Sequence, residues 1–68
     1  MQEISKKLGK NFERIRIKKG MSQGDIYRST GMDRAYLSSL ENGKRNPTLS
    51  NIKKIAEALG VEPFELLK

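Results

Sequence analysis

Apolar residues recur at helical spacing along almost the whole chain, and no segment alternates with the period of two that a strand requires. The first predicted helix ends near Gly20, and Ser5 is a candidate cap for its beginning. Its inward face carries Ile4, Leu8, Phe12 and Ile15. The pattern therefore predicts that the chain begins with an amphipathic helix that buries one face.

A second helix is predicted to begin after Ser22, whose hydroxyl can accept a hydrogen bond from an unpaired backbone amide. Asp25 lies where a carboxylate favours the positive end of a helix, and the pair has the spacing of a capping box. Gly31 is suited to the left-handed residue that ends this helix. The second helix is thus expected from Gln23 to about Thr30.

Three further helices are predicted in the same way, from capping residues, apolar faces and terminating residues. Asp33 is expected to cap a third helix from Arg34 to about Asn42, which Gly43 closes. Thr48 is expected to cap a fourth, ended by Gly60 with an apolar contact from Val61, and Pro63 to open a short fifth. The inward residues are Leu37 and Leu40 in the third helix and Leu49, Ile52, Ile55, Ala56 and Leu59 in the fourth, while the fifth bears Phe64, Leu66 and Leu67. The expected fold is all-α, a single domain of five short helices over residues 1–68.

Residues 23–42 have the spacing of a helix-turn-helix, with two short helices joined by a tight turn at Gly31. The apolar residues expected to hold the two helices at a steep angle are Ile26, Met32, Leu37 and Leu40. The outward face of the second of these helices is then free to enter a DNA major groove, which is about 12 Å wide. The motif predicts a nucleic-acid partner.

Composition restricts the chemistry that the chain can perform. Its 68 residues contain 14 Lys and Arg against 8 Asp and Glu, a net charge of +6, and neither Cys nor His. Disulfides, thiolate zinc sites and imidazole catalysis are therefore excluded, and we expect no enzyme activity, no cofactor and no metal. No apolar run approaches the length of a membrane span, so we expect no membrane partner, a cytoplasmic location and no small-molecule substrate.

The positive charge is concentrated at one end of the chain. Residues 1–20 contain seven basic and two acidic side chains, residues 21–46 four and three, and residues 47–68 three of each. A solvated basic face on the first helix is the simple interpretation, with Lys6, Lys7 and Lys10 in solvent. Specific recognition must then depend on a few placed groups, while the remaining charge sets general attraction to a polyanion.

Four segments together resemble the Cro/repressor-type helix-turn-helix family, also called XRE-like regulators. They are residues 22–26 (SQGDI), 31–43 (GMDRAYLSSLENG), 47–49 (PTL) and 55–61 (IAEALGV). The resemblance extends from about Leu8 to Leu67. Residues 33–36 (DRAY) with Arg45 and Asn46 further resemble the controller proteins of restriction–modification systems.

The resemblance implies a transcriptional regulator that binds double-stranded DNA. It implies that Gln23 grips a phosphate with help from Ser22, and that Arg34 reads a guanine through its O6 and N7. The implied base-reading residues are Arg34, Ala35, Ser38 and Ser39. The other implied phosphate contacts are Tyr36, Asn42, Lys44, Arg45 and Asn46.

Several of these residues have plainer interpretations. Arg34 can instead pair with Asp33 or with solvent, and Asp33 itself is either a cap or a secondary base contact. The two serines of the third helix can be exposed residues that take no part in base reading. Lys44 and Arg45 can contribute general electrostatic attraction to a polyanion without making a directional contact.

Two sets of residues are expected to hold the protein together rather than touch DNA. Arg16 and Glu41 match a pair that forms an internal salt bridge in family members. Because one short helix reads few bases, we expect a homodimer on a palindromic operator. The dimer contact is assigned to Phe64, Leu66 and Leu67 with nearby residues of the fourth helix, and plain core packing is the alternative.

Two residues depart from the family pattern. Tyr27 stands where a small residue is usual, so it either points aside or widens the crossing of the motif helices. Gly24 lies inside a helix, where glycine costs about 1 kcal/mol relative to alanine. A protein-interaction module of the same fold, such as an antitoxin or a coactivator, is the competing function.

Overall fold

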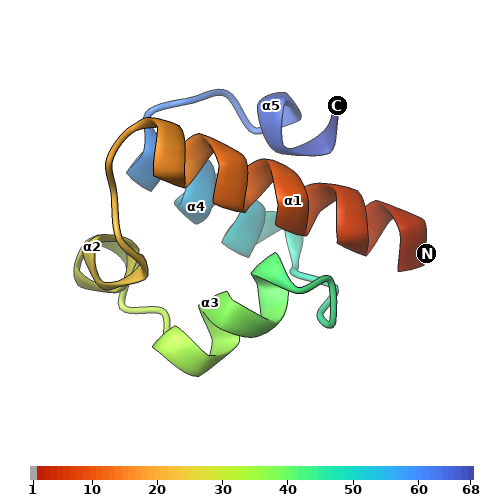
Figure 1. The fold of residues 1–68 in the computed structure, drawn as a ribbon, viewed down its shortest axis with the longest axis horizontal. Coiled ribbons are helices and arrows are strands. Elements are labelled where there is room, and N and C mark those ends of the chain that lie inside the picture. The colour runs from red at the N-terminus through yellow and green to blue at the C-terminus, as the bar shows by residue number, and fades with distance from the viewer. Residues whose placement is uncertain (1) are drawn as a thin grey trace.

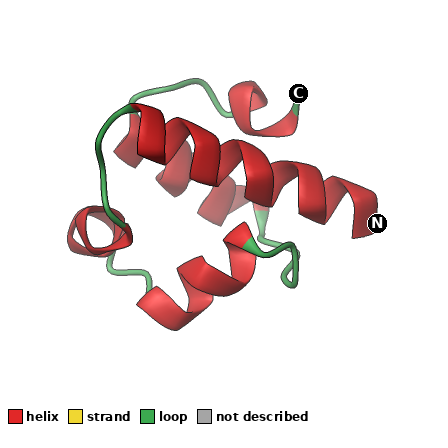
Figure 2. Cartoon of the chain, viewed as in Figure 1, coloured by secondary structure: helices red, strands yellow, loops and turns green. Residues whose placement is uncertain are grey.

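The structure, a computed structural model, describes residues 2–68, with the backbone alone at Gln2. Its helices are α1 (Gln2–Lys18), α2 (Gln23–Thr30), α3 (Arg34–Glu41), α4 (Leu49–Leu59) and α5 (Phe64–Leu67). Short loops join them, and no strand occurs among residues 2–68 (Figure 2). The predicted all-α class with five helices is confirmed.

Local capping explains where α2 and α4 begin and end. At α2 the predicted capping box is present: Ser22 Oγ accepts from the Asp25 amide at 3.0 Å, and the Ser22 amide donates to Asp25 Oδ2 at 2.8 Å. At α4, Thr48 Oγ1 accepts from the Asn51 amide at 3.1 Å. Gly60, with φ 75°, ends that helix in the left-handed conformation expected of it.

The longest helix organises the others. α1 crosses the molecule and packs against α5 on one side and α3 on the other, while α2 packs against α3 and α4 (Figure 1). The buried apolar core lies where these helices meet. It consists of Leu8, Phe12, Ile15, Ile26, Leu37, Leu40, Ile52, Ile55, Ala56, Leu59 and Leu66.

Four local predictions are wrong. Ser5 does not cap α1, because the helix begins at Gln2 and Ser5 is buried inside it. Asp33 occupies the position before α3, but its side chain accepts no capping hydrogen bond. Ile4 and Leu49 are exposed rather than inward, Leu49 by 83%. Both lie in the first turn of a helix, where side chains lean back past the helix beginning and away from the core.

α1 and α3 approach each other closely at Gly9. A Cβ atom on this buried glycine would lie 2.7 Å from the Glu41 carbonyl oxygen and closer still to that of Leu40. Real Cβ atoms essentially never come within 3.0 Å of another heavy atom. The absence of a side chain at Gly9 therefore allows the C-terminal end of α3 to rest directly on α1.

Candidate nucleic-acid interface

The turn between α2 and α3 is fixed by hydrogen bonds and by one left-handed residue. Gly31 has φ 77°, a conformation that glycine adopts without steric cost. Thr30 Oγ1 donates to the Ile26 carbonyl at 2.7 Å and accepts from the Met32 amide at 3.0 Å. Ile26 and Leu37 are fully buried behind the turn. The core side of α3 is thereby anchored, and its other face is left to solvent.

The four residues assigned to base reading lie on α3. Arg34 and Ala35 are exposed in its first turn, while Ser38 and Ser39 are partly buried one turn later. No ion pair joins Arg34 to Asp33 within residues 2–68. Of these four residues, the two in the first turn of α3 are therefore the more accessible from solvent.

The guanidinium of Arg34 lies against the first turn of α2. A Cβ atom added to Gly24 would lie 3.3 Å from Arg34 Cζ and closer to Nη2. Gly24 lies in the first turn of its helix and is buried. Sequence reasoning treated Gly24 only as a helix defect, because no local pattern connects it with a side chain ten positions later.

Glu41 receives hydrogen bonds from two helices other than its own. Arg16 Nε lies 2.7 Å from Glu41 Oε2, and Arg16 Nη2 donates to Oε1 at 3.2 Å. A third Arg16 nitrogen, Nη1, donates to the Met21 carbonyl at 2.8 Å. The side chains are only 13% and 6% exposed, and the hydrogen bond to Glu41 raises the pKa of Arg16 above its ordinary value. The ion pair expected from the sequence thus joins α1 to the end of α3.

Gln23 is also bound to this carboxylate. Its Nε2 atom donates to Glu41 Oε1 at 3.0 Å, which holds the side chain across the gap between α2 and α3. A side-chain amide nitrogen has two hydrogens, so the second remains for another acceptor. The first backbone amides of α2 lie beside it and have no partner within the helix. The Ser22 hydroxyl accepts the capping bond from the Asp25 amide and keeps its own hydrogen for another acceptor.

Tyr36 is held from two sides. Its hydroxyl accepts a hydrogen bond from Asn51 Nδ2 at 2.9 Å, and the guanidinium carbon of Arg45 lies 5.5 Å from the ring centroid. This is within the range of a cation–π contact. Tyr36 is partly buried, and only its hydroxyl hydrogen remains to be donated. Sequence reasoning missed Asn51, whose only local signal is its place three residues after the Thr48 cap.

The loop after α3 lies against the beginning of α1. Ser5 Oγ donates to Asn46 Oδ1, and the Cα of Lys6 lies close to Gly43, which has φ 73°. A shallow hollow is lined by Ser5, Lys6, Asn42, Gly43, Lys44, Arg45 and Asn46. All of the loop's predicted phosphate contacts are exposed, and Asn46 keeps its amide hydrogens for another acceptor. Lys6, interpreted as a solvated residue, is placed beside them.

One residue of the predicted dimer contact is misassigned. Leu66 is completely buried, because α5 turns this side chain toward α1, where Asn11 Nδ2 donates to the Leu66 carbonyl at 2.9 Å. It belongs to the core and cannot touch a partner. Phe64 and Leu67 are exposed, and Leu67 lines a shallow hollow with Leu49.

Tyr27 projects from α2 toward solvent. Its side chain is 47% exposed, so it points aside from the motif. This is the first of the two alternatives that the sequence leaves open.

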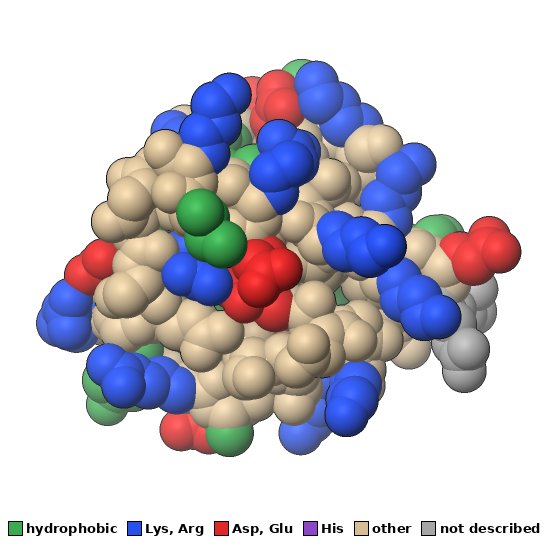
Figure 3. Space-filling model, viewed as in Figure 1, with side chains coloured by type: hydrophobic (Ala, Val, Ile, Leu, Met, Phe, Trp, Pro, Cys, Tyr) green, Lys and Arg blue, Asp and Glu red, His purple; other side chains and the backbone are tan. Residues whose placement is uncertain are grey.

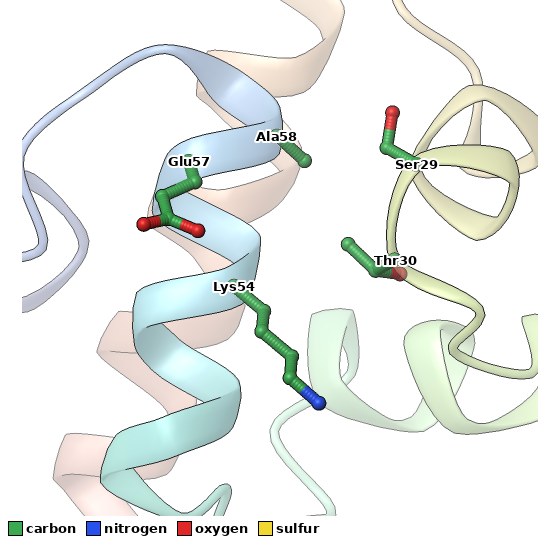
Figure 4. A pocket seen from close by; sticks show the side chains of 5 residues that line it. All are labelled: Ser29, Thr30, Lys54, Glu57 and Ala58. Carbon is green, nitrogen blue, oxygen red and sulfur yellow. The ribbon is translucent and has the colours of Figure 1, made fainter.

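Charged side chains gather unevenly over the surface. Figure 3 shows Lys and Arg side chains along α1, as the charge count of residues 1–20 leads one to expect. A separate hollow between α2 and α4 contains Ser29, Thr30, Lys54, Glu57 and Ala58. In Figure 4 Lys54 and Glu57 point apart on α4, and the Thr30 hydroxyl is already used in the turn. None of the helices in residues 2–68 combines the length and apolar character needed to cross a membrane.

Comparison with known proteins agrees with this geometry. Residues 12–66 match the helix-turn-helix family. An uncharacterized HTH-type transcriptional regulator of Sinorhizobium fredii, y4dJ, is 43% identical over 65 residues, which cover 96% of this chain and 84% of that protein. The restriction–modification controller protein C.AhdI from Aeromonas hydrophila superposes with a TM-score of 0.86 at 42% identity, covering 91% of this chain and 94% of that one.

A second controller protein was crystallised on DNA. C.Esp1396I, solved as a tetramer with its natural 35 base-pair operator, superposes with a TM-score of 0.82 at 32% identity and covers 96% of each chain. Both controllers share the fold over nearly the whole of this chain. The chain belongs to the Cro/repressor-type, or XRE-like, family of helix-turn-helix transcriptional regulators.

Proposed function

We propose that the protein is a sequence-specific regulator that binds a palindromic operator in double-stranded DNA as a homodimer, with α3 in the major groove. The observation that carries the proposal is the exposed first turn of α3, which presents Arg34 and Ala35 beside the open end of α2. The operator complex of C.Esp1396I supports it, since that controller has the same fold.

In this proposal bases are read by a small group on α3. Arg34 donates two hydrogen bonds to a guanine, a contact worth about 1–3 kcal/mol of discrimination. Ala35 is placed to touch a thymine methyl, and the less exposed Ser38 and Ser39 reach bases directly or through water when the helix lies deep in the groove.

Phosphates are gripped on both sides of α3. Gln23 offers its second amide hydrogen next to the first amides of α2, where the helix dipole favours an anion. Beyond the far end of α3 the phosphate contacts are Asn42, Lys44, Arg45 and Asn46, with Tyr36 donating its hydroxyl hydrogen. These contacts set register and salt dependence rather than sequence preference.

The dimer contact is proposed at the exposed apolar residues of α4 and α5. Leu49 is 83% exposed and lines the same hollow as Leu67, and Phe64 lies one turn before Leu67. Exposed large apolar side chains that cluster in this way are typical of protein–protein contacts. A two-fold dimer through this surface would place two reading helices on half-sites about 10 bp apart.

The DNA proposal is tested by selection from a random duplex library at moderate salt, repeated with Arg34→Ala and Gln23→Ala. The wild type is expected to enrich a palindrome. Arg34→Ala should lose the preference at one position in each half-site, whereas Gln23→Ala should weaken binding to all sequences alike. A wild-type protein that enriches no palindrome would contradict the proposal.

The dimer contact is tested by sedimentation with Leu49→Asp and with Ile17→Asp as its matched control. Ile17 is 61% exposed on α1 and lines neither hollow beside Leu67. The wild type and the control should be dimers at tens of micromolar, and Leu49→Asp should be a monomer. Equal masses for both variants would place the dimer contact elsewhere.

The alternative of a protein-interaction module is disfavoured by the chemistry of α3. Its outward residues are charged, small or hydroxylated, and an apolar outward face would be needed to dock another protein there. If the selection experiment enriches no DNA site, the protein-interaction module becomes the favoured function.

A further inference from the structure

The backbone conformation at position 24 does not require a glycine. It lies in the first turn of α2, and it is absent from the glycines of positive φ, which are Gly20, Gly31, Gly43 and Gly60. In a helical conformation alanine is favoured over glycine by about 1 kcal/mol. The reason for a glycine at this position therefore lies outside the helix.

The space next to Gly24 is filled by Arg34. A Cβ atom at this position would come within 3.3 Å of Arg34 Cζ and nearer still to Nη2, and its next neighbour would be Ser22 Oγ at 3.4 Å. The guanidinium thus rests on the bare backbone of the first turn of α2. This contact, and no other glycine contact in the motif, involves a residue assigned to base reading.

We infer that Gly24 is a specificity-determining residue, which acts by fixing the direction of the Arg34 guanidinium at the DNA surface. The inference rests on the proposed function, in which Arg34 reads a base. An exposed arginine samples many rotamers, and ordering it costs up to about 2 kcal/mol of side-chain entropy. A planar guanidinium that already rests on α2 loses less freedom when it forms two aligned hydrogen bonds to a guanine.

A side chain added at position 24 would first meet the flexible end of the Arg34 side chain. A methyl group at position 24 meets the terminal atoms of a long side chain and no backbone atom outside its own helix within 3.4 Å. Gly24→Ala should therefore leave the fold intact and move the guanidinium. Because alanine favours the helix, the Tm should rise, by up to about 4–8 °C if the full helix preference is realised.

The test compares base preference in the wild type, Gly24→Ala, Arg34→Ala and the double variant. Ser29→Ala is the matched control, since Ser29 is an exposed residue of the same helix. Binding is measured to the selected operator and to operators changed at the position whose preference Arg34→Ala loses. Gly24→Ala should reduce that preference about tenfold, which corresponds to about 1.4 kcal/mol. In the Arg34→Ala background it should have no further effect, and Ser29→Ala should match the wild type.

The outcomes separate the inference from the proposed function. If Arg34→Ala loses a base preference and Gly24→Ala keeps it within twofold, the inference is overturned and the proposed function stands. If the wild type enriches no operator, or Arg34→Ala keeps every preference, the proposed function fails and the inference with it. A loss in Gly24→Ala that persists without Arg34 would also overturn the inference.

A second measurement, made without DNA, examines the contact itself. The Arg34 Nε–H group should show a larger heteronuclear NOE in the wild type than in Gly24→Ala, because the glycine restrains the guanidinium. Equal mobility in the two proteins would mean that Gly24 does not hold Arg34, whatever the binding data show.

Discussion

The two ends of α3 are built in opposite ways. At its C-terminal end Leu40 and Glu41 press against α1, with the bare backbone of Gly9 beneath them and Arg16 bound to the carboxylate. At its N-terminal end Arg34 is exposed and rests on Gly24. Both ends use a helical glycine, but one glycine faces backbone carbonyls and the other faces the tip of a flexible side chain.

Of these two glycines, Gly9 is the one that the packing of α3 requires. Backbone carbonyls at the end of a packed helix cannot withdraw without moving the whole helix, whereas a guanidinium can take another rotamer. The buried end of α3 therefore fixes the position of the helix, whereas the contact at the exposed end bears only on the direction of one side chain.

Glu41→Ala should destabilise the protein by about 3–5 kcal/mol, because it leaves the Arg16 guanidinium without its buried partner. Much of a small domain's total stability would then be lost. Chemical denaturation followed by circular dichroism measures the effect. The matched control is Glu57→Ala, an exposed glutamate on α4, which should change stability by less than about 0.5 kcal/mol. If the two variants unfold at the same denaturant concentration, the ion pair does not contribute to anchoring α3.

Gly9→Ala should destabilise the protein by about 1–3 kcal/mol, since the added methyl overlaps the carbonyl oxygens of Leu40 and Glu41. The gain in helix preference works in the opposite direction and is smaller. Gly24→Ala is the natural comparison, because there the same substitution should stabilise. The prediction is wrong if thermal melts show the Gly9 variant to be as stable as the wild type.

The smallest effect concerns the capping box of α2. The Ser22 amide donates to the Asp25 carboxylate and lowers the pKa of Asp25 below its ordinary value of 3.8. The charged carboxylate therefore stabilises the folded state above that value, and this contribution is lost as the pH falls through the lower folded-state pKa. Melts of the wild type and Asp25→Asn at about pH 6 should differ, and the difference should shrink toward about pH 2. A constant difference would assign the effect to something other than the charge.

Much of the fold could be predicted because its signals are local. The capping residues Ser22 and Thr48 and the terminating glycines Gly31 and Gly60 act within a few residues of themselves, so a linear pattern identifies them. The spacing of the helix-turn-helix likewise depends on short-range geometry. These features gave helix bounds that agree with the structure to within about two residues, except at the beginning of α1.

The predictions that failed concern which residues of a helix are covered by a neighbouring helix. Periodicity placed Leu49 and Ile4 inward, but it cannot say that the first turn of each helix extends past the core. The four-residue helix α5 is barely one turn long, so spacing could not separate buried Leu66 from exposed Leu67. The contact between Gly24 and Arg34 joins two elements and has no local signature at all.

The hydrogen bonds shared by the Glu41 carboxylate predict which substitutions a genetic screen should recover. One oxygen accepts from Arg16 and also from Gln23, the residue proposed to grip a phosphate. A single carboxylate therefore both anchors α3 to α1 and orients the side chain proposed to grip a phosphate. A screen for variants that no longer bind their operator should accordingly recover substitutions of Arg16 and Glu41, although neither residue is assigned a contact with DNA.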